Sequence, residues 1–318
     1  MTTREAIVRE EQAGRDRRTF REGQTVRGAS RLVQYANFVR LPHTVFALPF
    51  ALVGVVLASY VAPVRWEAVG WAIVAFTTAR FAAMGFNRIA DRAYDATNPR
   101  TATRELPSGR LTVREAATSV AVACVVFVVA AWMLNPLCLA LSPFALAWVL
   151  LYSYTKRFTR WAHLVLGLGM GIAPVGGYLA VTGQWSEPWW LLPAIATAVM
   201  TWGAGFDVLY AMQDIAFDRA NRLHSIPAAY GVRRALRISR GLHVDTVVLL
   251  VAVVGAAQGT AGAGVLSWVG VGVVAALLGY EHSLVSETDQ SRLDAAFFKM
   301  NGVISIVFFG FVLLDRLI

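Results

Sequence analysis

Nine apolar stretches, most of them long enough to cross a lipid bilayer, dominate this chain of 318 residues. About 20 apolar residues span the hydrocarbon core as a helix, which also satisfies its own backbone polar groups. The chain is 57% hydrophobic and only 15% charged, which excludes an ordinary soluble domain. The predicted spans cover roughly residues 43–61, 68–86, 113–133, 137–154, 163–181, 189–210, 243–260, 263–281 and 298–315. We therefore expect an all-α integral membrane protein with nine transmembrane helices around a central cavity. Eight crossings is the alternative, because the fourth range is short and only a brief Gly/Ala turn joins the seventh and eighth.

Positive charge is distributed unevenly between the loops. Arginine and lysine residues gather after the second, fourth, sixth and eighth spans, and the other loops hold little beyond Arg65. Cytoplasmic loops carry this excess, so we expect a cytoplasmic N-terminus and a multi-pass protein of the inner (cytoplasmic) membrane. The formal charge of +9 then reflects topology and attraction to the membrane surface. We expect no nucleic-acid partner, and the sequence indicates no obligatory protein partner.

Two acidic motifs at the inner ends of the second and sixth spans carry the strongest functional signal. They consist of Asn87, Asp91 and Asp95, and of Asp207, Asp214 and Asp218. Steps of four residues keep side chains on one helix face, so each set can converge on one point. Carboxylates at the end of a bilayer-embedded helix are costly and indicate function. Two such sets facing each other would repel without cations, and hard oxygen ligands suit Mg²⁺ shared with substrate phosphates.

The two motifs also indicate how the chain is organised. Each motif, at 87–95 and at 207–218, ends a span and is followed by a loop containing Asn, Arg and Pro. This similarity predicts a repeated four-helix unit plus one further helix, with the site between the halves. Residues 31–318 would form that single domain. Residues 1–30 are polar and charged, unlike a signal peptide, and we expect disorder or a loosely attached surface helix.

A cavity between the motifs would suit a diphosphate that carries an apolar tail. Metal ions would neutralise the diphosphate and make it a leaving group through charge stabilisation. Each methylene of an isoprenoid tail costs roughly 0.8 kcal/mol to bring into water. An enzyme for such a substrate therefore works best in the bilayer, where the tail already lies.

These stretches resemble the UbiA superfamily of intramembrane aromatic prenyltransferases. That family carries the motifs Asn-x-x-x-Asp-x-x-x-Asp and Asp-x-x-x-Asp on nine transmembrane helices, and the resemblance covers nearly the whole chain beyond residue 31. Residues 41–50, the Asn-Pro-Arg-Thr at 98–101 and the Tyr-Ser-Tyr-Thr-Lys-Arg-Phe-Thr at 152–159 are similar to the same family. The second motif and the Leu-His-Ser-Ile-Pro at 223–227 most resemble the branch acting on 4-hydroxybenzoate or on the dihydroxynaphthoate of the futalosine menaquinone route.

The resemblance implies Mg²⁺-dependent transfer of a polyprenyl group from polyprenyl diphosphate to an aromatic acid. The acid would be 4-hydroxybenzoate or 1,4-dihydroxy-6-naphthoate, in ubiquinone or menaquinone biosynthesis. The implied metal-diphosphate ligands are Asn87, Asp91, Asp95, Asp214 and Asp218, of which Asp91 and Asp214 are assigned to catalysis. Lys156 and Arg157 would clamp phosphate oxygens, with Arg88 and Arg104 as further candidates. Ionisation would leave an allylic cation, which the ring carbon ortho to a phenol oxygen attacks.

The candidates for binding the aromatic acid lie deeper in the spans or at the interface. Asp207 would orient the phenol or take its proton, because partial desolvation makes a carboxylate a stronger base. Arg80, inside the second span, needs a partner: the acceptor's carboxylate, or Asp207 or another motif acid. Tyr210 is a candidate hydrogen-bond partner of a substrate oxygen. Arg40 and His43 are further acceptor-site candidates.

Two other function classes stay open on the sequence alone. An intramembrane terpene cyclase would also ionise an allylic diphosphate, but it would need no acceptor-orienting Arg80. A transporter for a divalent cation or a phosphorylated solute would need polar residues continuing to the outer face, which the last three spans lack. The other histidines show no metal-site spacing, and we expect them in loops or at the interface; they are His163, His224, His243 and His282.

Overall fold

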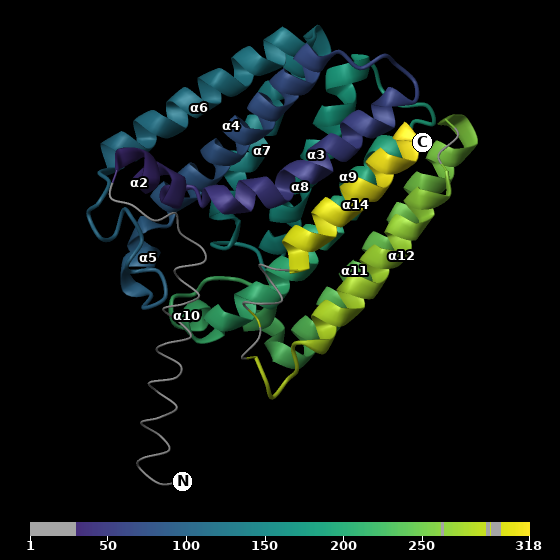
Figure 1. Cartoon of the computed structure of the whole chain (residues 1–318). Coiled ribbons are helices and arrows are strands. Elements are labelled where there is room, and N and C mark those ends of the chain that lie inside the picture. The colour runs from purple at the N-terminus through teal and green to yellow at the C-terminus, as the bar shows by residue number, and fades with distance from the viewer. Residues whose placement is uncertain (1–29, 262–263, 291–292, 294–299) are drawn as a thin grey trace.

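The structure, a computed structural model, describes residues 30–261, 264–290, 293 and 300–318. Nearly all of the predicted polar segment 1–30 lies outside this described part. The side chains of residues 42–46, which include His43, and of residues 260–261 also lie outside it. The described residues form a bundle of long helices without strands (Figure 1). In chain order these are α2 (Arg31–Phe38), α3 (Leu41–Ser59), α4 (Trp66–Ala90), α5 (Arg92–Thr97), α6 (Val113–Leu134), α7 (Pro136–Thr155), α8 (Ala162–Thr182), α9 (Leu191–Ala211), the 3-10 turn η1 (Met212–Asp214), α10 (Ile215–Ala220), α11 (Ile226–Ala261), α12 (Val265–Ser283) and α14 (Asn301–Leu317).

Each predicted apolar range falls on one of these helices. Seven helical stretches of the described chain are long and apolar enough to cross a bilayer, and they lie in α4, α6, α7, α8, α9 continued through α10, α11 and α12. The remaining two predicted ranges fall on α3, which contributes the shorter apolar stretch Ala47–Ser59, and on α14, which has 17 residues. The all-helical membrane architecture is therefore confirmed, and the count of nine crossings stays a prediction.

Local sequence explains where several helices begin and end. Thr112 and Glu115 form a capping box at the start of α6, which satisfies backbone N–H groups that have no helical partner. Asn135 caps α7 and is followed by Pro136 at the first helical position, where the missing N–H is not needed. Gly183 ends α8 with φ 63°, a conformation that residues with a Cβ rarely adopt.

Close backbone contacts hold α3, α8 and α9 together. A methyl group at Gly54 would lie 1.9 Å from the carbonyl oxygen of Pro174, and one at Gly171 would lie 2.3 Å from that of Ala196. Only glycine fits at these positions, so the backbones of α3 and α8, and of α8 and α9, touch directly. This packing gives α9 a buried, fixed place in the bundle.

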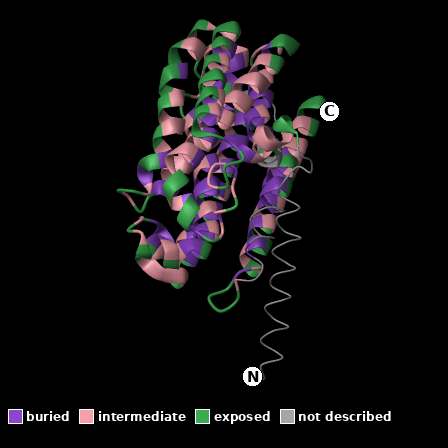
Figure 2. Cartoon of the chain, turned by 90° about the vertical axis from the view of Figure 1, so that its left-hand side faces the viewer, coloured by how far each residue is buried: buried purple, intermediate pink, exposed green. Residues whose placement is uncertain are grey.

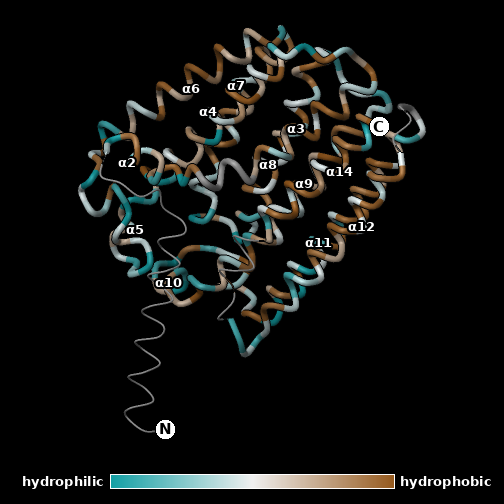
Figure 3. Tube along the Cα trace, viewed as in Figure 1, coloured by the Kyte–Doolittle hydropathy of each residue, from teal (hydrophilic) through white to brown (hydrophobic). Residues whose placement is uncertain are grey.

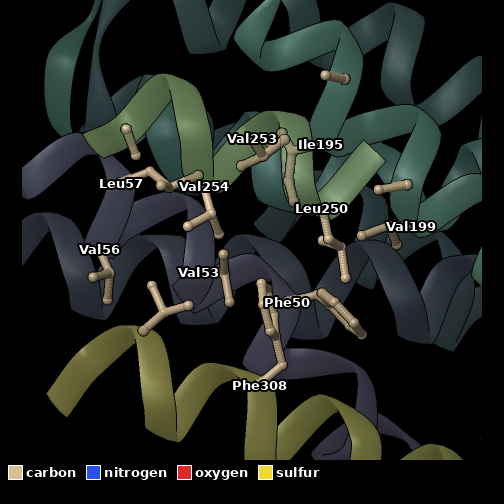
Figure 4. Close-up of a cluster of buried hydrophobic side chains, with 14 of the residues drawn as sticks. Phe50, Val53, Val56, Leu57, Ile195, Val199, Leu250, Val253, Val254 and Phe308 are labelled. Carbon is tan, nitrogen blue, oxygen red and sulfur yellow. The ribbon is translucent and has the colours of Figure 1, made fainter. Parts of the chain in front are cut away.

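A hydrophobic core fills the space around α9 away from the polar end. Phe50 of α3, Ile195 of α9, Val253 of α11 and Phe308 of α14 meet in this cluster (Figure 4). Buried residues run along the inside of the bundle, and exposed residues cover its outer faces (Figure 2). Many exposed side chains are large and apolar, as expected of surfaces that face lipid.

One end of the bundle is built differently from its middle. The short helices α5 and α10 lie at this end, and the C-terminus lies at the opposite end (Figure 1). Hydrophilic residues gather around α5 and α10 and at the nearby end of α11, whereas the long helices are mainly hydrophobic (Figure 3). Both acidic motifs end here, at the junctions of α4 with α5 and of α9 with α10.

Candidate active site

A polar cavity of about 280 Å³ lies at this end of the bundle, between α4, α7, α8, α9 and the start of α14. Six basic side chains and three carboxylates line it; they are Arg40, Arg80, Arg88, Arg100, Arg104, Lys156, Asp91, Asp207 and Asp214. Charge in a protein interior must be neutralised by partners or ligands. The excess of basic over acidic side chains therefore favours an anionic ligand.

The first motif reaches the cavity through two of its three residues. Asn87 and Asp91 line it, and the amide of Asn87 donates to the carboxylate of Asp91 over 2.9 Å. Asp95 lies outside the lining, because it binds the guanidinium groups of Arg104, at 2.6 Å, and of Arg88, at 3.9 Å. Burial and the negative charge of Asp95 raise the pKa of Asp91, although nearby basic groups oppose this shift.

The second motif is also divided between the cavity and its supporting wall. Asp214 lines the cavity and accepts from Arg100 Nε over 3.0 Å, from a second guanidinium nitrogen of Arg100, and from Asn98 over 3.2 Å. Arg100 also donates to the hydroxyl of Tyr210 over 2.6 Å. Asp218 is buried behind the lining, where the hydroxyl of Ser225 donates to it over 2.8 Å.

The oxygen donors suit Mg²⁺ that is completed by a ligand. In the described part of the chain, no three His, Cys, Asp or Glu side chains are grouped closely enough to hold a metal ion by themselves. Asn87, Asp91 and Asp214 nevertheless present hard oxygen atoms to one cavity. Mg²⁺ commonly takes only one or two carboxylates and fills its other positions with phosphate oxygens and water. The residues therefore fit a metal shared with a phosphorylated substrate, and not a protein cage.

Two adjacent basic residues after α7 occupy different environments. Lys156 lines the cavity, whereas Arg157 lies outside the lining, over the ring of Tyr154, and donates to the carbonyl oxygen of Ala90 over 2.8 Å. Burial alone would lower the pKa of Lys156, but four nearby carboxylates raise it above its ordinary value. Those carboxylates belong to Asp218, Asp207, Asp214 and Asp91. Lys156 is therefore held as a cation that faces the cavity.

Other predicted residues lie on the same wall. Arg40 lines the cavity from the residue before α3, with φ 49°, an uncommon conformation for a residue with a side chain. Arg80 lines it from the middle of α4, deeper than the motif residues, and Tyr210 lines it from the end of α9. The cavity thus gathers most of the predicted set, while Asp95, Asp218 and Arg157 support its wall from behind.

An apolar cavity of about 220 Å³ adjoins the polar one, among α3, α4, α7 and α8. The two share wall residues, which are Ala47, Arg80, Met84, Tyr152, Leu166 and Met170. Beyond this junction the wall is almost entirely apolar, with side chains such as Phe76 and Leu141. The combined space accommodates a molecule with an anionic head and an apolar tail.

Two residues at this site, Arg100 and His163, are not predicted from the sequence. Arg100 is one of the basic residues after the second span that the sequence assigns to membrane topology, yet its guanidinium binds Asp214 of the second motif. The prediction that His163 and His243 lie in loops or at the interface is wrong, because both are buried within helices, α8 and α11. Nδ1 of His163 lies 2.6 Å from a carboxylate oxygen of Asp207. Both contacts join residues far apart in the chain, so the spacing of residues within one helix does not predict them. The Asn-Pro-Arg-Thr at 98–101 was the one available signal for Arg100.

Comparison with known proteins agrees with this architecture. Residues 47–303 match the UbiA prenyltransferase family. The chain is 31% identical over 236 residues to the 4-hydroxybenzoate octaprenyltransferase of Alkalilimnicola ehrlichii, covering 74% of this chain and 77% of the relative. It is 32% identical over 234 residues to that of Aromatoleum aromaticum, with the same coverage.

Solved structures show the same arrangement of helices. The apo structure of a UbiA homolog from Aeropyrum pernix aligns with a TM-score of 0.77 and 32% identity, over 86% of this chain and 98% of that one. A UbiA homolog from Archaeoglobus fulgidus bound to GPP and Mg²⁺ aligns with a TM-score of 0.69, over 90% of this chain and all of that one. At 18% identity, the second likeness concerns the fold alone.

Proposed function

The chain belongs to the UbiA prenyltransferase family and is an aryl prenyltransferase, and on this premise we propose that it transfers a polyprenyl group from polyprenyl diphosphate to an aromatic acid with Mg²⁺ as its cofactor. The observation that carries the proposal is the pair of adjoining cavities. The polar cavity offers cations and metal-binding oxygens for a diphosphate, and the apolar cavity offers space for a prenyl tail. Aspartate residues alone would suit many metal enzymes, whereas this combination suits an amphiphilic diphosphate.

The diphosphate end would be bound by residues of both motifs. Asn87, Asp91 and Asp214 would hold Mg²⁺, which when bound neutralises the developing charge of the leaving diphosphate. Lys156 donates to diphosphate oxygens as a fixed cation. Arg88 and Arg104 add positive charge to the same wall.

Asp95 and Asp218 belong to the same proposed ligand set, although they lie behind the lining. To reach a metal in the cavity, Asp95 would exchange its bond with Arg104, and Asp218 its bond with Ser225, for the ion. Arg157 would act on the diphosphate through Asp91, whose carboxylate lies 3.5 Å from its guanidinium. These three residues therefore shape the site before the substrate arrives.

The aromatic acid would bind on the deeper side of the diphosphate. Arg80, at the junction of the two cavities, binds its carboxylate, and Asp207 accepts the phenol proton and so increases electron density at the ortho carbon. The C1–O bond of the allylic diphosphate breaks, and diphosphate leaves. The ortho carbon forms the new C–C bond and then loses its proton to water, which restores the aromatic ring, and Asp207 returns the phenol proton to the product. Tyr210 and Arg40, which line the polar cavity, are further proposed contacts of the acid. His43 stays a candidate from the sequence, because its side chain lies outside the described part.

The relatives named above favour 4-hydroxybenzoate over 1,4-dihydroxy-6-naphthoate as the acceptor. We place the site at the cytoplasmic face of the inner membrane, with nine crossings and the N-terminus inside. The asymmetry of basic loops supports that orientation. The gathering of α5, α10 and both motifs at one end of the bundle, opposite the C-terminus, also supports it (Figure 1).

Purified protein in liposomes tests the proposal, with Mg²⁺, geranyl diphosphate and each candidate acid in turn. One acid should be prenylated with its carboxyl retained, and Arg80→Ala should raise the KM for that acid while leaving the KM for the diphosphate unchanged. Arg65→Ala, at the opposite end of α4, is the matched control and should behave like the wild type. Diphosphate release without any acid, undiminished in Arg80→Ala, would instead favour a terpene cyclase.

A further inference from the structure

His163 is a buried polar side chain that the proposed reaction does not yet use. It lies in the first turn of α8, with no exposed surface, and its Nδ1 is 2.6 Å from Oδ2 of Asp207 in α9. A fully buried imidazole needs a partner for each ring nitrogen. The partners of the two ring nitrogens therefore indicate which nitrogen carries the proton and what role His163 has.

The second partner fixes the tautomer of this imidazole. The backbone N–H of Ile226, at the start of α11, donates to Nε2 of His163 over 3.3 Å. A backbone N–H can only donate, so Nε2 carries no proton and the ring hydrogen is on Nδ1. His163 is therefore a neutral donor to the carboxylate of Asp207.

The turn that holds His163 also supports two other site residues. The N–H of His224 donates to the carbonyl oxygen of Lys156 over 2.7 Å. The hydroxyl of Ser225, the next residue, donates to Asp218 over 2.8 Å. Residues 224–226 thus connect the beginning of α11 to Lys156, Asp218 and, through His163, Asp207. This arrangement makes the turn a common support for the wall of the polar cavity.

The bond from His163 leaves Asp207 with one oxygen for a ligand. Asp207 lines the polar cavity, and its side chain retains 19% exposure there. Oδ2 already accepts from the imidazole, so we assign Oδ1 to the substrate hydroxyl. A carboxylate held at one oxygen cannot rotate freely, and partners of this kind fix the geometry of reacting groups.

We propose that His163 is a positioning residue for the acceptor: it fixes the Asp207 carboxylate so that its free oxygen meets the phenol of the aromatic acid. The inference rests on the proposed function, because it gives Asp207 the role assigned there. It adds that the orientation of the acceptor depends on a neutral histidine outside both acidic motifs, held in its tautomer by the backbone of α11.

Two substitutions separate positioning from packing. In His163→Gln, the side-chain amide can donate to Asp207 and accept from Ile226, so both bonds can be kept. His163→Leu has a similar volume and keeps neither bond. We expect His163→Leu to lower kcat/KM for the aromatic acid roughly 10- to 100-fold. The KM for the prenyl diphosphate should stay within about twofold of the wild type, and His163→Gln should recover most of the loss.

A double variant tests whether His163 acts through Asp207. If it does, His163→Leu should cause little further loss of kcat/KM in an Asp207→Asn background, because residues that act as a unit are not additive. Equal losses in both backgrounds, or equal changes in KM for both substrates, would overturn the positioning role. Thermal unfolding in the same detergent identifies variants that fail to fold, and His163→Gln serves as the folded reference. Absence of any prenylated acid with the wild type would refute the proposed function instead.

Discussion

Substituting the adjacent residues Lys156 and Arg157 should have very different effects on diphosphate binding. Lys156 lines the polar cavity among four carboxylates, whereas Arg157 stacks over Tyr154 and Tyr94 at the surface. If these charges only set the membrane topology, the two positions would be equivalent. The structure makes them unequal, so Lys156→Met and Arg157→Met form a matched pair.

The magnitude follows from the type of contact that is lost. A hydrogen bond to a charged group contributes about 1.5–3 kcal/mol, which corresponds to roughly a 10- to 150-fold change in an equilibrium constant. Lys156→Met should therefore raise the KM for the prenyl diphosphate by roughly 10- to 150-fold. Arg157 is 35% exposed at its side chain, so its 3.5 Å contact with Asp91 is screened by solvent. Arg157→Met should change the same KM by no more than about fivefold, since exposed pairs are worth at most about 1 kcal/mol.

Steady-state kinetics in liposomes, with Mg²⁺ and the aromatic acid saturating, measures both variants. Thermal unfolding should show that each variant folds, because a lower yield of folded protein would imitate a loss of activity. Equal effects of the two substitutions on KM, or a larger effect for Arg157→Met, would refute the assignment of Lys156 to the diphosphate.

Three further predictions concern the metal, pH and helix packing. Chelation of Mg²⁺ should abolish product formation. Asp214→Asn should lower kcat by roughly 100-fold or more at saturating Mg²⁺. An Asp214→Asn variant as active as the wild type would contradict the assignment of Asp214 to the metal. Burial and the charge of Asp95 raise the pKa of Asp91. Mg²⁺ binds only the ionised carboxylate of Asp91, so the half-saturating Mg²⁺ concentration should rise as the pH falls through that raised pKa. In Asp95→Asn this rise should move to lower pH in the same titration, and an unchanged profile would argue against the assignment. Gly54→Ala should lower the unfolding temperature, because its methyl group would meet the Pro174 carbonyl at 1.9 Å. Such overpacking costs about 1–3 kcal/mol. Gly176→Ala is the control and should leave the unfolding temperature nearly unchanged, because a methyl group there has no neighbour within 4 Å.

The membrane helices could be located from sequence because the bilayer imposes a simple rule of length and hydrophobicity. The predicted range 137–154 becomes Pro136–Thr155, and 163–181 becomes Ala162–Thr182. The largest difference is at α11, which begins at Ile226 and not near residue 243. Its first turns carry many arginines and include a kink at Gly231, so hydropathy detects only the part within the apolar region.

The candidate site was predictable in composition but not in detail. Helical spacing placed Asn87 beside Asp91, and their side chains are hydrogen-bonded. The same spacing did not indicate that Asp95 turns away toward Arg104, or that Asp214 is bound by Arg100 from a loop more than 100 residues earlier. Such ion pairs depend on how separate helices meet, and the period of a single helix contains no information about that.

We propose that this protein forms a carbon–carbon bond between a prenyl group and an aromatic acid, using Mg²⁺ held by both motifs. The most direct test is mass spectrometry of the product made by purified protein in liposomes from 4-hydroxybenzoate, an allylic diphosphate and Mg²⁺. We expect a ring-prenylated acid that keeps its carboxyl group and is lost in both Asp91→Ala and Asp214→Ala. Metal-independent product, or undiminished product in either variant, would contradict it.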